Sequence, residues 1–456
     1  MLTLQNTFLE IKNEIIEIEN PSVFGWNEVF LEIQNKIQDK KNKYIIKLNL
    51  VKTTKDKLYF NVISVEGLKV NYSAFHSLGV APEGRRPDQG TMCRRSGGYL
   101  QATGPAVNGT NIKSDISCLI IPTGIGAAFG GYAGDANPLA KLLASQSDYL
   151  LTHPNVVNGA VLSDLPSNLI YLEGFFLDQF LLGNVNIIPN NKNKIGVIFD
   201  KGISEERLEY EVNVLNALRA FYGCEIISWT VTDKPLIVIP EVNKFGFSSG
   251  KVQNIESITN SAIKLKDLGA TAIAICCAIP DLELNSDYIS GSGIDPIGGI
   301  ESVISRSVSA FTGFVSAHAP VLISNEKVDY KKLSPLSAAE YIALTFLPSV
   351  ISGLRFAPEI VFKDTKNTLS FQNLSNIIVP YNAFGSPGVL YMNEVFKNVV
   401  LVEENKTCLE VNSKHLNIDF KVVKKYVNLI DLKMVEESGI DPDVFKRPLN
   451  KINRIS

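Results

Sequence analysis

The sequence predicts an α/β protein, with Rossmann-like parallel or mixed sheets, flanking helices, two lobes and an added N-terminal α+β cap. After Cys118, short apolar segments alternate with longer segments whose apolar residues recur every three or four positions. This alternation is typical of βαβ units. A chain of 456 residues is also too long for one ordinary core. We therefore expect a cap over residues 1–115 and α/β lobes over 116–275 and 276–456.

The cap is predicted from its own patterns. Residues 5–18 and 26–40 carry apolar side chains at helical spacing and predict two amphipathic helices. Residues 44–50 and 58–63 are apolar and rich in β-branched residues, and the short polar segment between them predicts a hairpin. Residues 73–114 show no periodicity, which in a compact protein indicates a functional or mobile loop.

Arginines are concentrated in this loop, at Arg85, Arg86, Arg94 and Arg95. Guanidinium groups can hold a phosphate or a carboxylate through paired hydrogen bonds. The alternative is a basic loop that is simply solvated. The sequence leaves both interpretations open.

The α/β region contains recognisable strands and helices. Its predicted strands are 149–152, 169–172, 195–199, 271–275, 377–380 and 399–402. Its predicted helices are 205–221, 255–268, 299–311, 335–352 and 388–396. Since ligands of such folds bind beyond the carboxyl ends of the strands, the residues that follow each strand are the candidates for a site.

A glycine-rich loop follows the apolar segment that ends near Ile121, and a helix follows the loop. Glycines without Cβ atoms expose backbone N–H groups, and a helix N-terminus favours an anion. The helix begins at Pro138, with Asp135 or Asn137 as its cap. The glycine spacing fits neither the dinucleotide fingerprint nor the P-loop. The predicted ligand-binding residues are Thr123, Gly124, Gly126, Gly130 and Gly131, although these glycines could instead only permit close packing.

Two histidines follow or end apolar segments and are the predicted acid–base residues. His153 stands beside Asn155 and Asn158, which we predict to bind ligand; the alternative is a histidine satisfied by backbone in a turn. His318 follows a helix start that contains Gly298, Gly299 and Glu301. Glu301 could orient His318 or only complement the helix dipole, and the two glycines form a second predicted anion site.

A third glycine turn lies between the strand at 377–380 and the next helix. Gly385, Ser386 and Gly388 could bind an anion there, together with Asn382. The alternative is structural, since Ser386 can cap the helix and Pro387 can begin it.

Cysteine and carboxylate patterns add little chemistry. Cys276 and Cys277 end a strand where a thiolate could act, although buried cysteine is the commoner reading. No spacing of Cys, His, Asp or Glu is diagnostic of a metal site, so we predict no metal. No motif requires a cofactor, and the sequence does not identify one.

The overall composition limits the partners. The chain has 44 Lys and Arg against 47 Asp and Glu, a net charge of -3, which argues against nucleic acid. No apolar run has the length of a membrane span, and the N-terminus does not resemble a secretory signal. We therefore predict a cytoplasmic protein that binds a small anionic molecule. We expect it to bind neither nucleic acid nor a membrane, and homo-oligomers are possible.

Several of these segments, in the same order, resemble an uncharacterised and mainly cyanobacterial family, domain of unknown function 3326. The resemblance is carried by residues 122–136, 152–158, 298–301, 317–320, 379–382 and 385–388, and it covers roughly 115–430. It implies no reaction. It marks the same segments that the strand ends select, and it does not require cysteines at Cys276 and Cys277.

Together these observations predict an enzyme that acts on a small carboxylated or phosphorylated metabolite by proton transfer. His153 and His318 would serve as acid and base, and Asp135 and Glu301 would orient them. An isomerase or lyase is favoured over a hydrolase, because no nucleophile elbow or metal motif is present to activate water. The alternative is a non-catalytic protein that binds or senses a metabolite or nucleotide.

Overall fold

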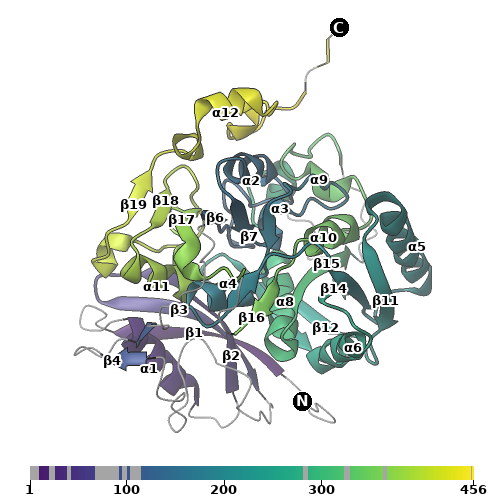
Figure 1. Ribbon diagram of the computed structural model, residues 1–456, viewed down its shortest axis with the longest axis horizontal. Helices are drawn as coiled ribbons and strands as arrows, with labels where there is room; N and C mark the ends of the chain where they lie inside the picture. The colour runs from purple at the N-terminus through teal and green to yellow at the C-terminus, as the bar shows by residue number, and fades with distance from the viewer. Residues whose placement is uncertain are drawn as a thin grey trace.

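The computed structural model describes residues 10–19, 26–38, 43–66, 92–94, 100–102, 114–280, 286–322, 329–362, 367–452 and 454–455. Its described part contains two parallel sheets with flanking helices and an antiparallel N-terminal sheet. In Figure 1 the N-terminal sheet lies at the lower left, the strands of the larger parallel sheet lie above it, and the smaller parallel sheet lies at the right. The predicted α/β class is confirmed.

The larger sheet has six parallel strands in the order β19-β18-β17-β6-β7-β8. Its strands are β6 (Ile116–Leu119), β7 (Tyr149–Thr152), β8 (Leu169–Tyr171), β17 (Leu374–Pro380), β18 (Val399–Val402) and β19 (Lys421–Val423). Its helices are α2 (Asn137–Ala144), α3 (Pro154–Val157), α4 (Gly174–Leu181) and α11 (Pro387–Val395). Every residue of β6 and β18 is buried, as expected for strands covered on both faces.

The smaller sheet has four parallel strands in the order β11-β10-β14-β15. They are β10 (Lys194–Phe199), β11 (Glu225–Val231), β14 (Ala272–Ile279) and β15 (Val315–Leu322). Its long helices are α5 (Glu205–Tyr222), α6 (Ile255–Asp267) and α8 (Gly298–Thr312), and α10 (Leu347–Leu354) packs on β14 and β15. A two-stranded ribbon, β12 (Ile237–Val242) with β13 (Ser248–Gln253), packs against α8.

The N-terminal sheet is antiparallel, in the order β1-β3-β2. The predicted hairpin is confirmed as β2 (Lys43–Thr53) and β3 (Lys57–Glu66), and the second predicted helix as α1 (Trp26–Gln38). The helix predicted over 5–18 is wrong where the structure describes it, because β1 (Glu10–Glu19) pairs along its whole length with β3. Its isoleucines fit helical spacing, but β-branched residues also favour strands, and pairing with a neighbouring strand decides.

The remaining elements are short. They are β4 (Met92–Arg94) with β5 (Leu100–Ala102), β9 (Asn186–Ile188) with β16 (Glu359–Val361), α7 (Ser286–Ser290), α9 (Ala338–Tyr341) and α12 (Leu432–Glu437), and the 3₁₀ turns Phe371–Asn373, Ser413–Leu416, Tyr426–Leu429 and Pro442–Phe445. The predicted arginine cluster falls almost entirely outside the described residues: Arg85, Arg86 and Arg95 lie outside them, and only the backbone of Arg94 lies in β4. The role predicted for that cluster stays a prediction.

The sheets do not follow the predicted boundary between residues 275 and 276, which falls inside β14. The larger sheet takes β6, β7 and β8 from one side of that boundary and β17, β18 and β19 from the other. The smaller sheet is formed by chain that lies between β8 and β17. The two sheets are therefore interleaved in the sequence, with one inserted into the other.

Helix α8 lies where the three parts of the fold meet. It packs on β15 of the smaller sheet, on α4 of the larger sheet and on β2 of the N-terminal sheet. The N-terminal sheet is also fastened directly, since the Leu50 N–H donates to the Gly385 carbonyl at 2.9 Å. This meeting point positions the site described below.

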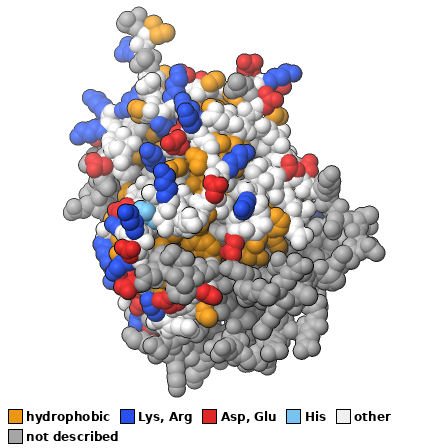
Figure 2. Space-filling model, turned by 90° about the vertical axis from the view of Figure 1, so that its left-hand side faces the viewer, with side chains coloured by type: hydrophobic (Ala, Val, Ile, Leu, Met, Phe, Trp, Pro, Cys, Tyr) orange, Lys and Arg blue, Asp and Glu red, His pale blue; other side chains and the backbone are white. Residues whose placement is uncertain are grey.

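The surface shows charges of both signs. On the face drawn in Figure 2, Lys and Arg side chains alternate with Asp and Glu, and apolar side chains gather between them. Within the described residues, no helix has both the length and the apolar character needed to cross a bilayer.

Candidate functional site

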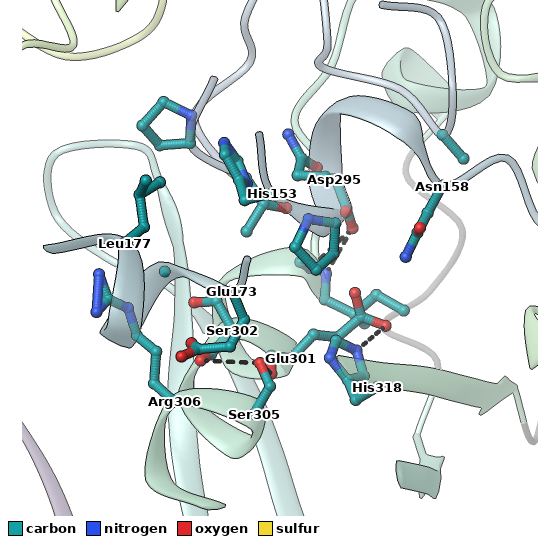
Figure 3. A pocket seen from close by; sticks show the side chains of 18 of the residues that line it. His153, Asn158, Glu173, Leu177, Asp295, Glu301, Ser302, Ser305, Arg306 and His318 are labelled. Atoms are coloured by element: carbon teal, nitrogen blue, oxygen red, sulfur yellow. Dashed lines mark hydrogen bonds and ion pairs between the residues drawn. The ribbon is translucent and has the colours of Figure 1, made fainter. Parts of the chain in front are cut away.

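A cavity of about 180 Å³ opens beside the N-terminal half of α8. Its wall combines side chains from β2, from the loop after β6, from the starts of α3 and α4, from α8 itself and from β15. Figure 3 shows how these side chains converge from separate elements. The cavity therefore lies beyond the carboxyl ends of β6, β7 and β8, where ligands of parallel sheets bind.

About half of the predicted site residues line this cavity. They are Thr123, Gly131, His153, Asn155, Asn158, Gly298, Glu301, His318 and Ser386. The other predicted residues do not line it: Asp135, Gly124, Gly126, Gly130, Gly299, Asn382, Gly385 and Gly388. The reasons for this division are given below, contact by contact.

Glu301 and His318 form a carboxylate–imidazole pair in the cavity wall. Glu301 Oε1 lies 3.0 Å from His318 Nε2, and the two side chains are only 15% and 10% exposed (Figure 3). The two atoms are close enough for an ion pair, but neither makes a hydrogen bond among the described residues. A carboxylate in this position would stabilise the imidazolium that forms when the ring takes a proton.

His153 lies in the wall, but its predicted acid–base role needs correction. Its Nε2 accepts the backbone N–H of Ile121 at 3.0 Å, so the ring proton is on Nδ1 and the lone pair is already used. Burial, together with the nearby cations Arg306 and Lys47, lowers the pKa of His153 to about 3. His153 is thus a neutral hydrogen-bond donor at physiological pH, not a base.

Arg306 provides a buried positive charge at one end of the cavity. Its Nη2 donates to Asp178 Oδ2 at 2.5 Å, and the two side chains are 8% and 6% exposed. Its Nη1 is buried and has no hydrogen-bond partner among the described residues. Gly174 permits this position, because a Cβ there would come within 3.1 Å of the guanidinium carbon. A buried donor without a partner costs free energy and marks a place for a ligand acceptor.

Lys47 adds an amine beside the Arg306 guanidinium. It reaches the cavity from β2, and its Nζ donates to Ser302 Oγ at 3.0 Å. Burial and the charge of Arg306 lower the pKa of Lys47 to about 7, although Asp178 acts in the opposite direction. A substantial fraction of Lys47 is therefore uncharged near neutral pH.

Glu173 is buried beside Arg306 but serves helix α4. As its N-cap, Glu173 accepts the N–H groups of Phe175 and Phe176 at 2.6 and 2.9 Å. Burial raises the pKa of Glu173 to about 7, against the lowering effect of Arg306 and these two N–H groups. Its oxygens are occupied by backbone, so we assign it a structural role.

Carboxyl groups gather around the Glu301–His318 pair, at the other end of the cavity. Burial and the charge of Glu301 raise the pKa of Asp295 to about 7, and burial and the charge of Asp295 raise that of Glu340 to about 8. Glu340 accepts the Ala133 N–H at 3.0 Å and also the Tyr288 hydroxyl. The cavity thus has a cationic end at Arg306 and Lys47 and an acidic end whose carboxyls keep protons up to neutral pH.

The start of α8 does not offer free N–H groups to an anion. Asp295 Oδ1 accepts the N–H groups of Ile297 and Gly298 at 2.9 and 3.0 Å. Gly299 donates to Ser248 Oγ at 2.8 Å, and a Cβ on Gly299 would come within 2.0 Å of the Ser248 carbonyl oxygen. The anion site predicted at Gly298 and Gly299 is therefore filled by the protein's own Asp295 and Ser248.

The glycine loop after β6 mainly supports close packing. Gly124 has a φ of +71°, which glycine adopts easily, and its carbonyl accepts the Ser248 N–H at 2.8 Å. Asn155 holds the loop, since its Nδ2 donates to the carbonyls of Ile121 and Gly130, both at 2.8 Å. This is the packing alternative that the sequence left open. Asn158 differs, because its Oδ1 accepts the Tyr171 hydroxyl at 3.1 Å and its side chain lines the cavity.

Asp135 lies outside the cavity and neither orients a histidine nor caps α2. Its Oδ2 accepts from Arg447 Nη2 at 3.0 Å, and its side chain is 4% exposed. The Arg447 guanidinium also lies 3.8 Å from the centre of the Phe129 ring. Burial raises the pKa of Asp135 to about 6, and Arg447 limits the rise. This contact fastens the C-terminal segment to the glycine loop.

The third predicted turn is also largely structural. Gly385 packs on β2, where a Cβ would come within 2.4 Å of the Leu50 carbonyl oxygen. Gly388 packs against Leu181, and Ser386 caps α11 by accepting the Val389 N–H at 3.3 Å. Asn382 uses its side chain to bind the backbone of Thr407 and Leu409. Only Ser386 reaches the cavity.

Cysteine and metal chemistry find no support in the cavity. Cys276 and Cys277 are buried within β14, and burial raises the pKa of both thiols well above the usual range. Within the described residues, no group of three or more His, Cys, Asp or Glu side chains could hold a metal ion.

Sequence reasoning missed the charged residues that the cavity uses most. Asp178 is the lone charge of the strongly apolar helix α4, which is a signal of a buried pair, whereas Arg306 shares α8 with Glu301 and several serines. Lys47 carries no comparable signal, because a lysine in an amphipathic strand normally faces solvent. Asp295 and Glu340 become relevant only through their contacts across the cavity.

Residues 116–446 match the model of a family described as proteins of unknown function, DUF3326. The chain belongs to this family. A relative from Synechococcus sp., which is named an uncharacterized lipoprotein, is 35% identical over 336 residues. The aligned residues cover 72% of this chain and 93% of that relative. No solved structure matches the chain.

The family match confirms the predicted resemblance to DUF3326, and it has two consequences. It begins at residue 116, so Lys47 comes from outside the part of the chain that defines the family. The description of the DUF3326 family names no reaction, so the function must be inferred from the cavity. The predicted cytoplasmic location stays a prediction.

Proposed function

We propose that this protein is an enzyme that binds a small carboxylated or phosphorylated metabolite and transforms it by general acid–base chemistry. The observation that carries the proposal is the polarity of the cavity. Arg306 Nη1, a buried guanidinium nitrogen with no hydrogen-bond partner in the described part of the chain, stands at one end, and the Glu301–His318 pair stands at the other. An anion satisfies the first group, and the second can move a proton on the rest of the molecule.

Each group has a role that its contacts support. Arg306 would hold the anionic group through Nη1. His318 would take a proton at Nδ1 while Glu301 stabilises the imidazolium at Nε2. Neutral His153 would donate its Nδ1–H to oxygen where negative charge develops, as an uncharged imidazole can. Glu340 and Asp295, which keep protons near neutral pH, are acids for the return step.

We favour an isomerase or lyase over a hydrolase. The serine hydroxyls of the cavity donate to carbonyls of their own helix, with Ser302 Oγ 2.8 Å from the Gly299 oxygen. Ser305 likewise contacts the Glu301 carbonyl at 3.4 Å. Neither serine contacts a histidine in the described part of the chain, and Ser302 accepts from Lys47 Nζ while its own proton goes to the Gly299 carbonyl, so no base receives the proton of either hydroxyl.

The alternative is a protein that binds or senses the same anion without changing it. Arg306 supports this alternative as well, since its Nη1, which has no hydrogen-bond partner among the described residues, needs only an acceptor. The two functions differ in what His318 does. In the enzyme it moves a proton, and in the binding protein it does not.

Proton exchange separates the two functions without knowledge of the product. The purified protein is incubated in D₂O with small carboxylates, oxo acids and phosphorylated sugars, and proton NMR follows the loss of carbon-bound protons. Binding is measured in parallel by thermal shift. We expect exchange with at least one compound, lost in His318→Gln but not in His415→Gln, a matched control whose ring contacts Thr53. Binding should survive His318→Gln and be lost in Arg306→Met.

Three results would contradict the proposal. Exchange that persists in His318→Gln removes the acid–base role of the pair. Binding without exchange by any compound favours the sensing protein. If none of the anions binds, the assignment of Arg306 as an anion site is wrong.

A further inference from the structure

We propose that Lys47 is an amine nucleophile that forms an imine with the carbonyl carbon of a 2-oxo acid held in the cavity. The inference rests on the proposed function and names the substrate class of that site. It assigns a covalent role to a residue that lies outside the family-matched part of the chain.

The contacts of Lys47 are those of an amine kept free of a carboxylate. Its Nζ donates to Ser302 Oγ at 3.0 Å, a neutral acceptor. Asp178 is the carboxylate whose charge acts on the pKa of Lys47, and it forms an ion pair with Arg306 at 2.5 Å. A lysine paired with a carboxylate would stay protonated, whereas a hydroxyl partner permits the neutral amine.

The neighbourhood of Lys47 favours the same state. Its ammonium form would be partly withdrawn from water, beside the fixed positive charge of Arg306, and both effects disfavour the charged form. This combination of desolvation and a neighbouring cation is how proteins prepare lysines that attack carbonyl groups. The low pKa of about 7 supports the role that the contacts indicate.

The position of Arg306 identifies the substrate class. Lys47 and Arg306 line the same cavity, and Arg306 lies close enough to lower the pKa of Lys47. If Arg306 Nη1 holds a carboxylate, the electrophilic carbon that faces Lys47 lies next to that carboxylate. A carbonyl group adjacent to a carboxylate defines a 2-oxo acid.

The step balances without an added oxidant or reductant. The Lys47 nitrogen attacks the carbonyl carbon, the C–N bond forms, and the carbonyl oxygen receives protons as the nitrogen loses them. The oxygen then leaves as water and the C=N bond forms, so the net change is amine plus ketone to imine plus water. His153 lines the same cavity, and its Nδ1–H is the ring donor that would stabilise this oxygen. The protonated imine then withdraws electrons and makes the neighbouring carbon acidic, which gives the Glu301–His318 pair a proton to remove.

Reductive trapping tests the proposal on the intact protein. The chain is incubated at pH 7 with pyruvate, glyoxylate or 2-oxoglutarate and sodium cyanoborohydride, which supplies hydride to the imine, and peptides are mapped by mass spectrometry. An ordinary lysine with a pKa of about 10.4 is almost fully protonated at this pH, so Lys47 should react about a thousandfold faster than surface lysines. Lys47→Arg should abolish the adduct. Lys52→Arg, on the same strand but paired with Glu410, should leave it.

Binding of the same probes and of lactate and phosphate is measured in parallel by thermal shift. A reduced adduct at Lys47 with one of the oxo acids supports the proposal. Stabilisation by the oxo acids without any adduct at Lys47 overturns the imine and leaves the anion site standing. If neither adduct nor stabilisation occurs with the oxo acids, the imine is excluded, and if lactate and phosphate also fail, the proposed anion site fails with it. Because the adduct is mapped in the wild-type chain, the result does not depend on whether a variant folds.

Discussion

Replacing Arg306 by Met should raise the pKa of Lys47 and slow the reactions of its amine at neutral pH. The pKa of Lys47 lies at about 7 because burial lowers it most and Arg306 lowers it further. Arg306 is the smaller cause, so its removal should raise the pKa of Lys47 but leave it below the usual range of lysine. A rise of about one pKa unit would lower the neutral fraction at pH 7 from about one half to about one tenth, a roughly fivefold loss of reactivity.

Replacing Asp178 should shift the pKa of Lys47 in the opposite direction. Its charge raises the pKa of Lys47, so Asp178→Asn should lower that pKa below its value in the wild-type chain. The gain in reactivity at pH 7 is limited to about twofold, because about half of the amine is already neutral. The opposite signs of the two variants separate an electrostatic cause from a general loosening of the cavity, which would act in one direction.

The assay is competitive labelling with acetic anhydride over a range of pH, with Lys47 quantified by peptide mass spectrometry and Lys52 as the internal reference. Each variant breaks a buried ion pair, which costs about 3–5 kcal/mol of stability, so circular dichroism must first show that it is folded. The reasoning is refuted if Lys47 titrates together with Lys52 in the wild-type chain. It is also refuted if Arg306→Met leaves the titration of Lys47 unchanged.

Three further predictions concern stability. The pKa of Glu340 is raised to about 8, so the folded state binds the proton of Glu340 more tightly than the unfolded state. The free energy of unfolding should therefore fall as pH rises from about 5 to 8. Glu340→Gln should flatten this slope in urea titrations. Arg447→Met strands its buried carboxylate partner and should cost about 3 kcal/mol by urea unfolding, whereas exposed Arg454→Met should cost less than about 0.5 kcal/mol. Gly299→Ala places a Cβ within 2.0 Å of a backbone oxygen and should lower the free energy of unfolding by more than about 2 kcal/mol. Gly313→Ala should lower it by about 1 kcal/mol, because only the positive φ opposes alanine there. Equal losses in the two variants would contradict the steric argument.

The strands and helices of the parallel sheets could be predicted from the sequence because their patterns are local. β14 is an unbroken apolar run, and all eight of its residues are buried, as a central parallel strand requires. β1 could not be predicted in this way, since its isoleucines suit a helix or a strand and pairing with β3 makes the choice. The interleaving of the two sheets is likewise invisible to local patterns.

The candidate site was predictable in position more than in chemistry. His153 was found because it follows the carboxyl end of a predicted strand, and Glu301 because it stands in the first turn of a predicted helix. The state of His153 depends on one contact with Ile121, distant in sequence, that fixes its proton on Nδ1. The glycine turns predicted anion binding, but their N–H and carbonyl groups form hydrogen bonds within the protein, as the Gly299 N–H does with Ser248. Whether a turn binds a ligand or a neighbouring element is decided by tertiary structure alone.

β6 remains an open edge for a long part of the synthesis of this chain. It pairs with β7 on one side, but its other neighbour, β17, begins only at Leu374, more than two hundred residues after β8 ends at Tyr171. At a translation rate of about 5–20 residues per second, this buried-type strand waits roughly 10–40 s for its partner. An unpaired apolar edge is a template for wrong pairing. The nascent chain therefore has to be shielded until its last quarter emerges, and the cavity that depends on both sheets can form only at the end of translation.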